Sequence, residues 1–286
     1  MFIYDKDKSI SIFSRGKNGT TNFHNHYWMN KDNIDIGSYL DFDESKWQFA
    51  NPLPAVEDMV RGCINTNLNN HHPSEHFYQG GNRRLGMYVH EYITFLKVCK
   101  LIGHDVEHYI IVRDPLQRLA SGLSTAIQNT PDAEAQRVCG TTFSELNERC
   151  KTHKLLYNDD FVNTLINDIL RLQGSQYHAQ SWLYHLHKHI DIQDFNIQAI
   201  DIYDIVPFAK DKLDIDLLET DKDDEHWHGR HTGTREPETR YFHNFLIKWI
   251  GETYENGTMQ GSGKDLLDRE YQVYDKLTIK HYDINT

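Results

Sequence analysis

The sequence predicts an α/β fold in which helices flank a central, mostly parallel β-sheet. Three short segments have the composition of buried strands: residues 9–14, 108–112 and 197–203. Segments with apolar residues at helical spacing separate these strands along the chain. Strands that alternate with helices in this way are typical of a parallel sheet with helices on both faces.

The predicted strands follow one another at wide intervals. SISIFS at residues 9–14 alternates polar and apolar side chains and runs directly into a loop with two glycines. A second strand is expected over residues 85–89, ending at His90. HYIIV at residues 108–112 is a short strand of the buried type that parallel sheets contain, and IQAIDIY at residues 197–203 is a further predicted strand.

Helices are predicted between and after these strands. Residues 91–101 carry apolar side chains at helical spacing, and Gly103 is expected to stop this helix. Pro115 suits the first turn of the next helix, because its fixed φ and missing N–H are tolerated there. The other helical patterns cover residues 21–30, 143–151, 159–172, 177–189, 206–213, 239–254 and 264–277.

The composition is that of a globular protein. Of the 286 residues, 38% are hydrophobic and 25% are charged, which is enough apolar material for a sizeable core. We expect a single domain over residues 1–286, with residues 31–82 and 215–286 as peripheral covering segments. The formal net charge of −12 argues against nucleic acid as the main partner, because duplex binders need a basic surface. An anionic ligand would have to be held by a local cluster of cations and N–H groups.

The sequence predicts no membrane span. No apolar run reaches the roughly 18 residues that a span needs, and MFIYDKDKSI at the N-terminus lacks the apolar region of a signal peptide. We therefore expect a soluble, cytoplasmic protein. The lack of an anchor favours a bacterial or viral source over a Golgi enzyme.

Cysteine and histidine spacing does not predict a metal site. Cys63, Cys99, Cys139 and Cys150 lack metal-site spacing and favour free thiols, with a single Cys139–Cys150 bridge as the alternative in a secreted protein. Of the 18 histidines, those at 185–189 fall in a predicted helix, where alternate residues diverge. Those at 226–231 have no cysteine nearby. We expect no metal.

A glycine-containing loop follows the first strand and precedes a predicted helix. Loop N–H groups and a helix N-terminus together favour negative charge, and Lys17 adds a positive charge. A Walker loop needs Ser or Thr directly after its lysine to hold Mg²⁺, whereas Asn18 follows Lys17. We therefore predict metal-free phosphate binding, with a plain glycine turn as the alternative. The predicted ligands are Arg15, Gly16, Lys17, Asn18, Gly19, Thr20, Thr21 and Asn22.

A second anion-binding motif, VRDPLQRLAS, follows the strand at residues 108–112. Arg113 at the strand end can bind a phosphate through two N–H groups, and Ser121 can add a hydroxyl from the next helix. Arg118 could add charge or pair with Asp114. The alternative for Arg113 and Asp114 is an ordinary ion pair at a helix start. Because the carboxyl ends of parallel strands meet at one edge, both motifs are expected there.

Both motifs resemble those of sulfotransferases that use 3′-phosphoadenosine 5′-phosphosulfate (PAPS). RGKNGTT is similar to the family's 5′-phosphosulfate loop. In the family's second motif, the residues that match Arg113 and Ser121 grip the ribose 3′-phosphate. The resemblance implies a P-loop-like three-layer fold, PAPS as co-substrate and no metal. Weaker likenesses are Arg230, in a loop that would close over the nucleotide, and YQVYDKL at residues 271–277, which is similar to the carbohydrate-directed branch.

The acceptor hydroxyl must lose a proton as it attacks sulfur, so a base is expected near the two motifs. His90 is the predicted base, because it is expected to end the strand at residues 85–89. The layout around it is similar to that of the uronyl 2-O-sulfotransferases, which place a catalytic His before their Arg-Asp-Pro strand. A register one residue later would make Glu91 the base. Lys17 is expected to stabilise charge on the bridging oxygen and the leaving 5′-phosphate.

The predicted function is sulfation of an acceptor hydroxyl. A carbohydrate is favoured by the likeness to the carbohydrate-directed branch and by the polar, aromatic-containing segment 31–82. A small molecule and a peptide tyrosine are the other acceptors. Two other classes are alternatives: a P-loop kinase or nucleotide hydrolase, and a non-catalytic nucleotide-binding module. The sequence does not indicate an oligomeric state.

Overall fold

The computed structural model describes residues 2–5, 8–14, 89–103, 105–152, 158–172, 175, 179, 181–215 and 241–282. The chain divides into two compact units. Unit 1 comprises Met1–Val112, His185–Thr232 and Leu277–Thr286, and unit 2 comprises Arg113–Tyr184 and Gly233–Lys276. The expectation that the chain forms a single domain stays a prediction.

Unit 1 is built on a five-stranded sheet in which four neighbouring strands run parallel. The strands are β1 (Phe2–Asp5), β2 (Ile10–Phe13), β3 (Glu107–Val112), β4 (Gln198–Asp201) and β5 (Ile279–Lys280). They lie in the order β1-β2-β3-β4-β5, and β1 pairs antiparallel with β2 at one edge. An α/β architecture with a parallel sheet packed against helices is therefore confirmed.

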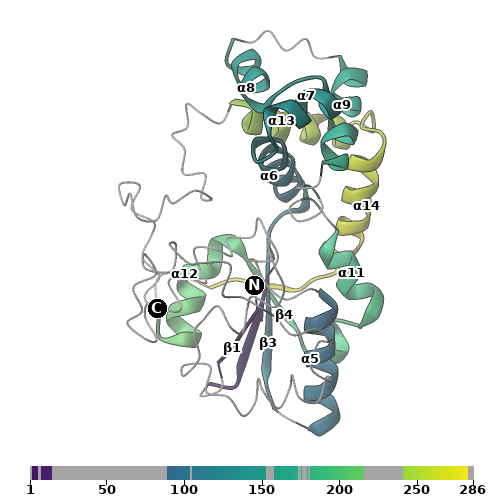
Figure 1. Cartoon of the computed structure of the whole chain (residues 1–286). Coiled ribbons are helices and arrows are strands. Elements are labelled where there is room, and N and C mark those ends of the chain that lie inside the picture. Colours follow the sequence, from purple (N-terminus) through teal and green to yellow (C-terminus); the bar gives the residue numbers. More distant parts are fainter. Residues whose placement is uncertain are drawn as a thin grey trace. The chain divides into compact units, whose positions relative to one another are not determined.

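Helices pack on both faces of this sheet (Figure 1). The described helical segments of unit 1 are α5 (Val89–Ile102), the end of α11 from His185, η3 (Gln193–Phe195), η4 (Ile202–Asp204), α12 (Ile205–Phe208) and η5 (Ala209–Leu213). Side chains alternate between the two faces along a strand. On one face Phe13 stacks on Tyr92 of α5, with ring centroids 4.4 Å apart. On the other face Tyr109 contacts Phe208 of α12, with centroids 4.9 Å apart. Strands covered on both faces are largely apolar, as β2 and β3 are.

A buried hydrogen bond joins β2 to β3. The Ser11 Oγ and His108 Nδ1 atoms lie 2.7 Å apart, and both side chains are buried. The two residues are register partners. A slip of one residue would move one side chain to the other face and leave a buried polar group unsatisfied, which costs about 1–3 kcal/mol. The pair therefore favours the observed register.

The predicted strand at residues 85–89 is wrong at its described end. Val89 and His90 are the first two residues of α5, and residues 85–88 lie outside the described part of the chain. Buried side chains recur every three or four residues along α5, at Val89, Tyr92, Ile93, Leu96 and Cys99. Packing of this face outweighs the local β preference of valine. Gly103, at φ 64°, follows the helix end as predicted.

Unit 2 is helical, with α6 at its centre (Figure 1). Its helices are α6 (Pro115–Gln128), α7 (Asp132–Cys139), α8 (Phe143–Lys151), α9 (Asp159–Arg171), α13 (Tyr241–Glu255), α14 (Ser262–Tyr274) and the first turn of α11 (Trp182–His189). α6 packs against α8, α9, α13 and α14. Its buried residues include Ala120, Gly122 and Ala126, whose small size lets neighbouring helices approach closely.

Most of these helices lie close to the predicted ranges. α8, α9, α13 and α14 correspond to the predictions at 143–151, 159–172, 239–254 and 264–277. α12 and η5 together cover the predicted helix at 206–213, and α11 covers the described end of the one at 177–189. α7 was not predicted, because only Ala135 of its residues is buried and it lacks an apolar stripe. The predicted helix at 21–30 lies outside the described residues.

Short-range hydrogen bonds set the helix starts of unit 2. Thr142 and Glu145 form a capping box at α8, in which each side chain accepts from the other residue's backbone N–H. The side chain of Asn158 caps α9. Asn147 of α8 accepts from the backbone N–H of Phe242, so α8 also positions the start of α13.

Two asparagines of α9 hold the loop before α14. Asn163 Oδ1 accepts from the backbone N–H of Gln260 at 3.0 Å, and Asn167 Oδ1 accepts from that of Ser262 at 2.9 Å. Between these two bonds, Gly261 has φ 75° and ψ −159°, a conformation open mainly to glycine. A Cβ added at Gly261 would lie 2.7 Å from Asn167 Nδ2.

Gly261→Ala is therefore expected to lower the free energy of unfolding by about 1–3 kcal/mol, because the backbone is strained and Asn167 is displaced. Urea denaturation measures the change. Gly257→Ala is the matched control, since Gly257 has φ 76° but no atom within 4 Å of an added Cβ. Its loss should be smaller, about 1 kcal/mol. Equal losses for both variants would contradict the role given to Asn167.

Candidate functional site

The carboxyl ends of the parallel strands in unit 1 form the edge at which both predicted phosphate motifs begin. The first motif follows β2 and the second follows β3, and these strands are hydrogen-bonded neighbours, with Phe13 paired to Ile110. Just beyond β2, Ser14 Oγ donates to the carbonyl oxygen of Ile111 at 3.3 Å. The strands that carry the two motifs therefore run side by side and end at the same edge.

The ligands predicted in the first motif lie outside the described residues. They are Arg15, Gly16, Lys17, Asn18, Gly19, Thr20, Thr21 and Asn22. Arg230, predicted to close over a nucleotide, also lies outside them. The roles of all these residues stay predictions, and the described chain brings their starting point, buried Ser14, against β3.

The second motif begins at Arg113, directly after β3, and continues into α6. The half-buried Arg113 donates from Nε to Oε1 of Gln117 at 3.4 Å. Gln117 and Ser121 are also half-buried and lie four residues apart, so they share one side of α6. Gln117 was not predicted, although its position midway between Arg113 and Ser121 could have identified it.

Asp114 marks the start of α6. Its Oδ1 atom accepts from the backbone N–H of Gln117 at 3.0 Å, and Pro115 occupies the first turn as predicted. Its Oδ2 atom accepts the phenol O–H of Tyr271 in α14 at 2.9 Å. Asp114 therefore links two helices, which goes beyond the ordinary ion pair with Arg113 that was the alternative.

Arg118 is a buried structural residue. It is 3% exposed, and its Nη1 lies 3.9 Å from Oε2 of Glu270, which is 4% exposed. The Oε1 atom of Glu270 accepts from the backbone N–H groups of Leu183 and Tyr184 at 3.0 and 3.1 Å. Burial raises the pKa of Glu270, and Arg118 and the two N–H groups partly offset this effect. The structure pairs Arg118 with Glu270, a partner that was not predicted.

The predicted bases, His90 and Glu91, lie in the first turn of α5. Their side chains are outside the described ones. The reason given for His90, that it ends a strand at residues 85–89, is therefore wrong. Its place in the chain between the two motifs still holds, and the roles of His90 and Glu91 stay predictions.

A carboxylate–imidazole pair that was not predicted lies beyond β4 and β5. Asp204 Oδ2 and His281 Nδ1 are 2.8 Å apart. Asp204 ends η4, which follows β4, and His281 directly follows β5. A carboxylate at Nδ1 orients the ring and leaves Nε2 for proton exchange, as in catalytic triads. In the sequence, Asp204 follows the predicted strand at residues 197–203, but nothing marked His281, because β5 was not predicted.

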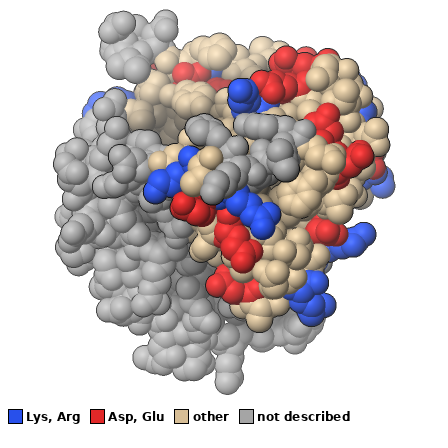
Figure 2. Space-filling model, turned by 90° about the horizontal axis from the view of Figure 1, so that it is seen from above, with Lys and Arg blue, Asp and Glu red and all other residues tan. Residues whose placement is uncertain are grey.

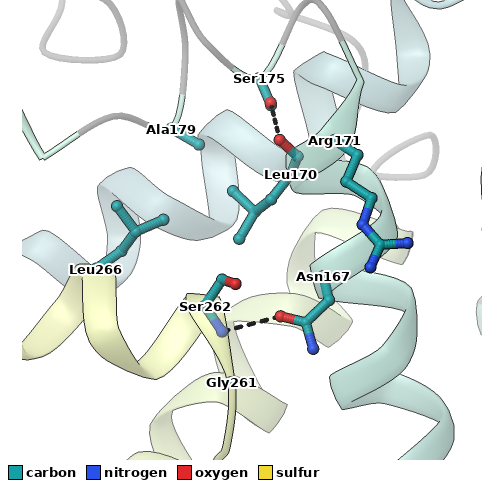
Figure 3. A pocket seen from close by; sticks show the side chains of 8 residues that line it. All are labelled: Asn167, Leu170, Arg171, Ser175, Ala179, Gly261, Ser262 and Leu266. Carbon is teal, nitrogen blue, oxygen red and sulfur yellow. Dashed lines mark hydrogen bonds between the residues drawn. The ribbon is translucent and has the colours of Figure 1, made fainter.

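A pocket of about 490 Å³ opens in unit 2 between the end of α9 and the start of α14 (Figure 3). Asn167 and Arg171 of α9 line it opposite Ser262 of α14, and no predicted site residue is among its lining. Arg171 is paired with Asp168 at 3.1 Å, and its side chain is 74% exposed. The pocket therefore contains none of the predicted site residues, and the guanidinium of Arg171 is already paired with the carboxylate of Asp168.

Acidic and basic side chains are interspersed on the face shown in Figure 2. Over the described residues of this face, no extended basic area is present. This distribution agrees with the net charge of −12. It gives a nucleic acid no broad basic surface on this face.

Cys99, Cys139 and Cys150 are free thiols, so the alternative of a Cys139–Cys150 bridge is not realised. Burial raises the pKa of Cys139 to about 11 and that of Cys150 to about 12, which keeps both protonated at neutral pH.

Within the described ranges, no group of three or more His, Cys, Asp or Glu residues could hold a metal. In the same ranges, no helix is long and apolar enough to cross a membrane.

No protein-family model matches this chain, and no curated protein or solved structure is significantly similar to it.

Proposed function

We propose that the protein is a sulfotransferase that transfers the sulfuryl group of PAPS to an acceptor hydroxyl. One observation carries this proposal: the two strands that lead into the phosphate motifs, β2 and β3, are parallel neighbours. PAPS carries anionic groups on the 5′ and 3′ positions of one ribose. Neighbouring parallel strands, about 4.8 Å apart, can present two anion sites within the length of one nucleotide.

The residue roles follow the two motifs. The loop of residues 15–22 would hold the 5′-phosphosulfate through its N–H groups and Lys17. Arg113 and Ser121 would hold the 3′-phosphate, and the hydrogen bond to Gln117 orients the guanidinium of Arg113. A mostly parallel sheet with helices packed on both faces supports a P-loop-like three-layer fold for unit 1.

The proposed chemical step is an in-line displacement at sulfur. The acceptor oxygen bonds to sulfur as the bond between sulfur and the bridging oxygen breaks. The electron pair of that bond stays on the 5′-phosphate, so 3′-phosphoadenosine 5′-phosphate leaves, and the hydroxyl proton passes to a base. Lys17 stabilises the charge on the bridging oxygen. His90 or Glu91 is the proposed base.

The Asp204–His281 pair is a poorer candidate for this base. β5 lies three strands from β2. At about 4.8 Å per strand, His281 begins roughly 14 Å across the sheet from a sulfuryl group held beyond β2. A general base must lie within hydrogen-bond reach of the proton that it removes. This separation favours the residues between the two motifs.

The favoured acceptor is a carbohydrate hydroxyl. Its support is the polar, aromatic-containing segment 31–82 and the YQVYDKL sequence at 271–277. Tyr271, the first residue of this sequence, contacts Asp114 of the second motif, and the preceding Glu270 contacts Arg118.

Calorimetric titration in EDTA tests the proposal. 3′-Phosphoadenosine 5′-phosphate, the product nucleotide, is expected to bind at least tenfold more tightly than adenosine 5′-phosphate without metal. Binding of ATP alone, and only with Mg²⁺, would contradict the proposal and favour a P-loop kinase or hydrolase. Tight binding of the product nucleotide, with no transfer of labelled sulfate from PAPS to glycan, tyrosine or small-molecule hydroxyls, would favour a non-catalytic binding module.

A further inference from the structure

Two neighbouring stripes of residues run along the start of α6. Arg113, Gln117 and Ser121 form the first stripe, which is polar and half-buried. Asp114 and Arg118 form the second, and both contact α14. Arg113 directly precedes the N-cap residue Asp114, and Gln117 is next to Arg118 on α6, so a shift of the second stripe also displaces the first. The contacts of α14 with the second stripe therefore influence the positions of the proposed 3′-phosphate ligands, Arg113 and Ser121.

Tyr271 holds the first residue of the second stripe. Its O–H donates to Asp114 Oδ2 at 2.9 Å, while Oδ1 of the same carboxylate accepts from the N–H of Gln117. Its ring stacks on Tyr254, with centroids 5.5 Å apart. Burial and the neighbouring Asp114 raise the pKa of Tyr271, so the phenol remains a donor at neutral pH. The Asp114 carboxylate thus fixes the helix start that follows Arg113, because one of its oxygens bonds to Tyr271 and the other to the N–H of Gln117.

Glu270 holds the second residue of this stripe, one turn further along α6. Its carboxylate lies 3.9 Å from the guanidinium of Arg118 and accepts two backbone N–H groups at the start of α11. Both Glu270 and Arg118 are buried. Buried side chains held by several partners have little freedom to move, so this contact fixes the turn that precedes Ser121.

We propose that Tyr271 and Glu270 are positioning residues that set Arg113 and Ser121 in the geometry that selects a 3′-phosphate. This inference rests on the proposed function and adds two residues from a distant helix to it. Neither residue would touch the nucleotide. Their loss should weaken recognition of the 3′-phosphate and leave the rest of the nucleotide's binding energy intact.

Tyr271→Phe tests this inference, because it removes one O–H and keeps the ring. The measurement is calorimetric titration in EDTA with 3′-phosphoadenosine 5′-phosphate and with adenosine 5′-phosphate. The dissociation constant of adenosine 5′-phosphate divided by that of 3′-phosphoadenosine 5′-phosphate reports recognition of the 3′-phosphate alone. We expect the variant to lower this ratio about fivefold, the change that corresponds to loss of one hydrogen bond. Its affinity for adenosine 5′-phosphate should stay within about twofold of the wild-type value.

Tyr254→Phe is the matched control. Tyr254 also donates to an aspartate, Asp268, at 3.0 Å, and it stacks on the same Tyr271 ring. This bond is exposed and does not involve α6. The control should leave the ratio unchanged. Asp114→Asn is the second test variant, because it keeps an oxygen for the helix cap and is expected to lower the ratio in the same direction.

Each outcome decides a different question. An unchanged ratio in Tyr271→Phe and Asp114→Asn, with a wild type that prefers the 3′-phosphate, overturns the positioning role and spares the proposed function. An equal loss of affinity for both nucleotides indicates a merely structural role and overturns it too. A wild type with no preference for the 3′-phosphate overturns the proposed function, and the positioning role with it.

Discussion

Replacing Arg113 by alanine is expected to weaken binding of 3′-phosphoadenosine 5′-phosphate about a hundredfold. A guanidinium that binds a phosphate through two charge-assisted hydrogen bonds contributes roughly 2–3 kcal/mol, and each 1.4 kcal/mol is a factor of ten. Affinity for adenosine 5′-phosphate should change far less, because that nucleotide lacks the group that Arg113 would bind. Calorimetry in EDTA with both nucleotides measures the difference.

Arg171→Ala is the matched control for this prediction. It removes the same charge from unit 2, but Arg171 is exposed and paired with Asp168. A general electrostatic effect on an anionic nucleotide would weaken binding in both variants alike, and that result would contradict a direct contact with Arg113. Arg113→Lys should recover only part of the affinity, because a lysine cannot form the paired hydrogen bonds of a guanidinium.

Arg118→Leu is expected to lower the free energy of unfolding by about 3–5 kcal/mol at pH 8, because it leaves the Glu270 carboxylate buried without its cationic partner. Burial already raises the pKa of Glu270 in the folded protein, and Arg118 opposes that shift. Loss of Arg118 should therefore raise this pKa further. The remaining partners of the carboxylate are the N–H groups of Leu183 and Tyr184.

The sign of the pH dependence follows from this shift. The pKa of Glu270 is higher in the folded protein than in the unfolded chain. Its contribution to the free energy of unfolding is therefore fully present below its ordinary pKa of 4.5 and is lost as pH rises through the raised pKa. The variant should therefore be destabilised less at pH 5 than at pH 8. Urea denaturation at the two pH values, beside Arg171→Leu as the exposed-pair control, measures this. A loss below about 1 kcal/mol at pH 8, or one independent of pH, would contradict the buried-pair interpretation.

The strands that the sequence predicted well are those with their own local signal. β3 is a short apolar run, and β2 lies within a run of isoleucine and serine, so both were located to within a residue or two. β1 and β5 were not predicted. β5 has only two residues, and it is a strand because Ala199 and Ile200 of β4 pair with it. No short-range pattern encodes a partner that lies 80 residues away.

His90 shows the opposite error, in which a local pattern was misleading. Val89 favours a strand, yet it starts a helix, since the buried residues of α5 recur at helical spacing from Val89 to Cys99. Tertiary packing overrides local propensity in such short segments. The predicted helix began at residue 91, whereas α5 begins two residues earlier, at Val89.

The strand end and helix start around the second motif were predicted correctly, but the partners of its side chains could not be predicted. Arg113 and Ser121 were identified by resemblance, and the structure places Gln117 between them. The partners of Asp114 and Arg118 come from α14, with Tyr271 157 residues beyond Asp114. A single sequence gives no information on such distant pairs, so Arg118 was expected to be a ligand or a partner of Asp114.

The division of unit 2 into two chain segments has a consequence for biosynthesis. Arg113–Tyr184 and Gly233–Lys276 are translated separately, with β4 made between them and β5 after them. At about 5–20 residues per second, Tyr271 leaves the peptidyl-transferase centre roughly 10–30 seconds after Asp114, its partner. Neither unit has all its segments until translation has passed Lys276. A ribosome-bound chain therefore cannot complete either unit before Lys276 has been made, and neither unit is expected to fold well ahead of the other.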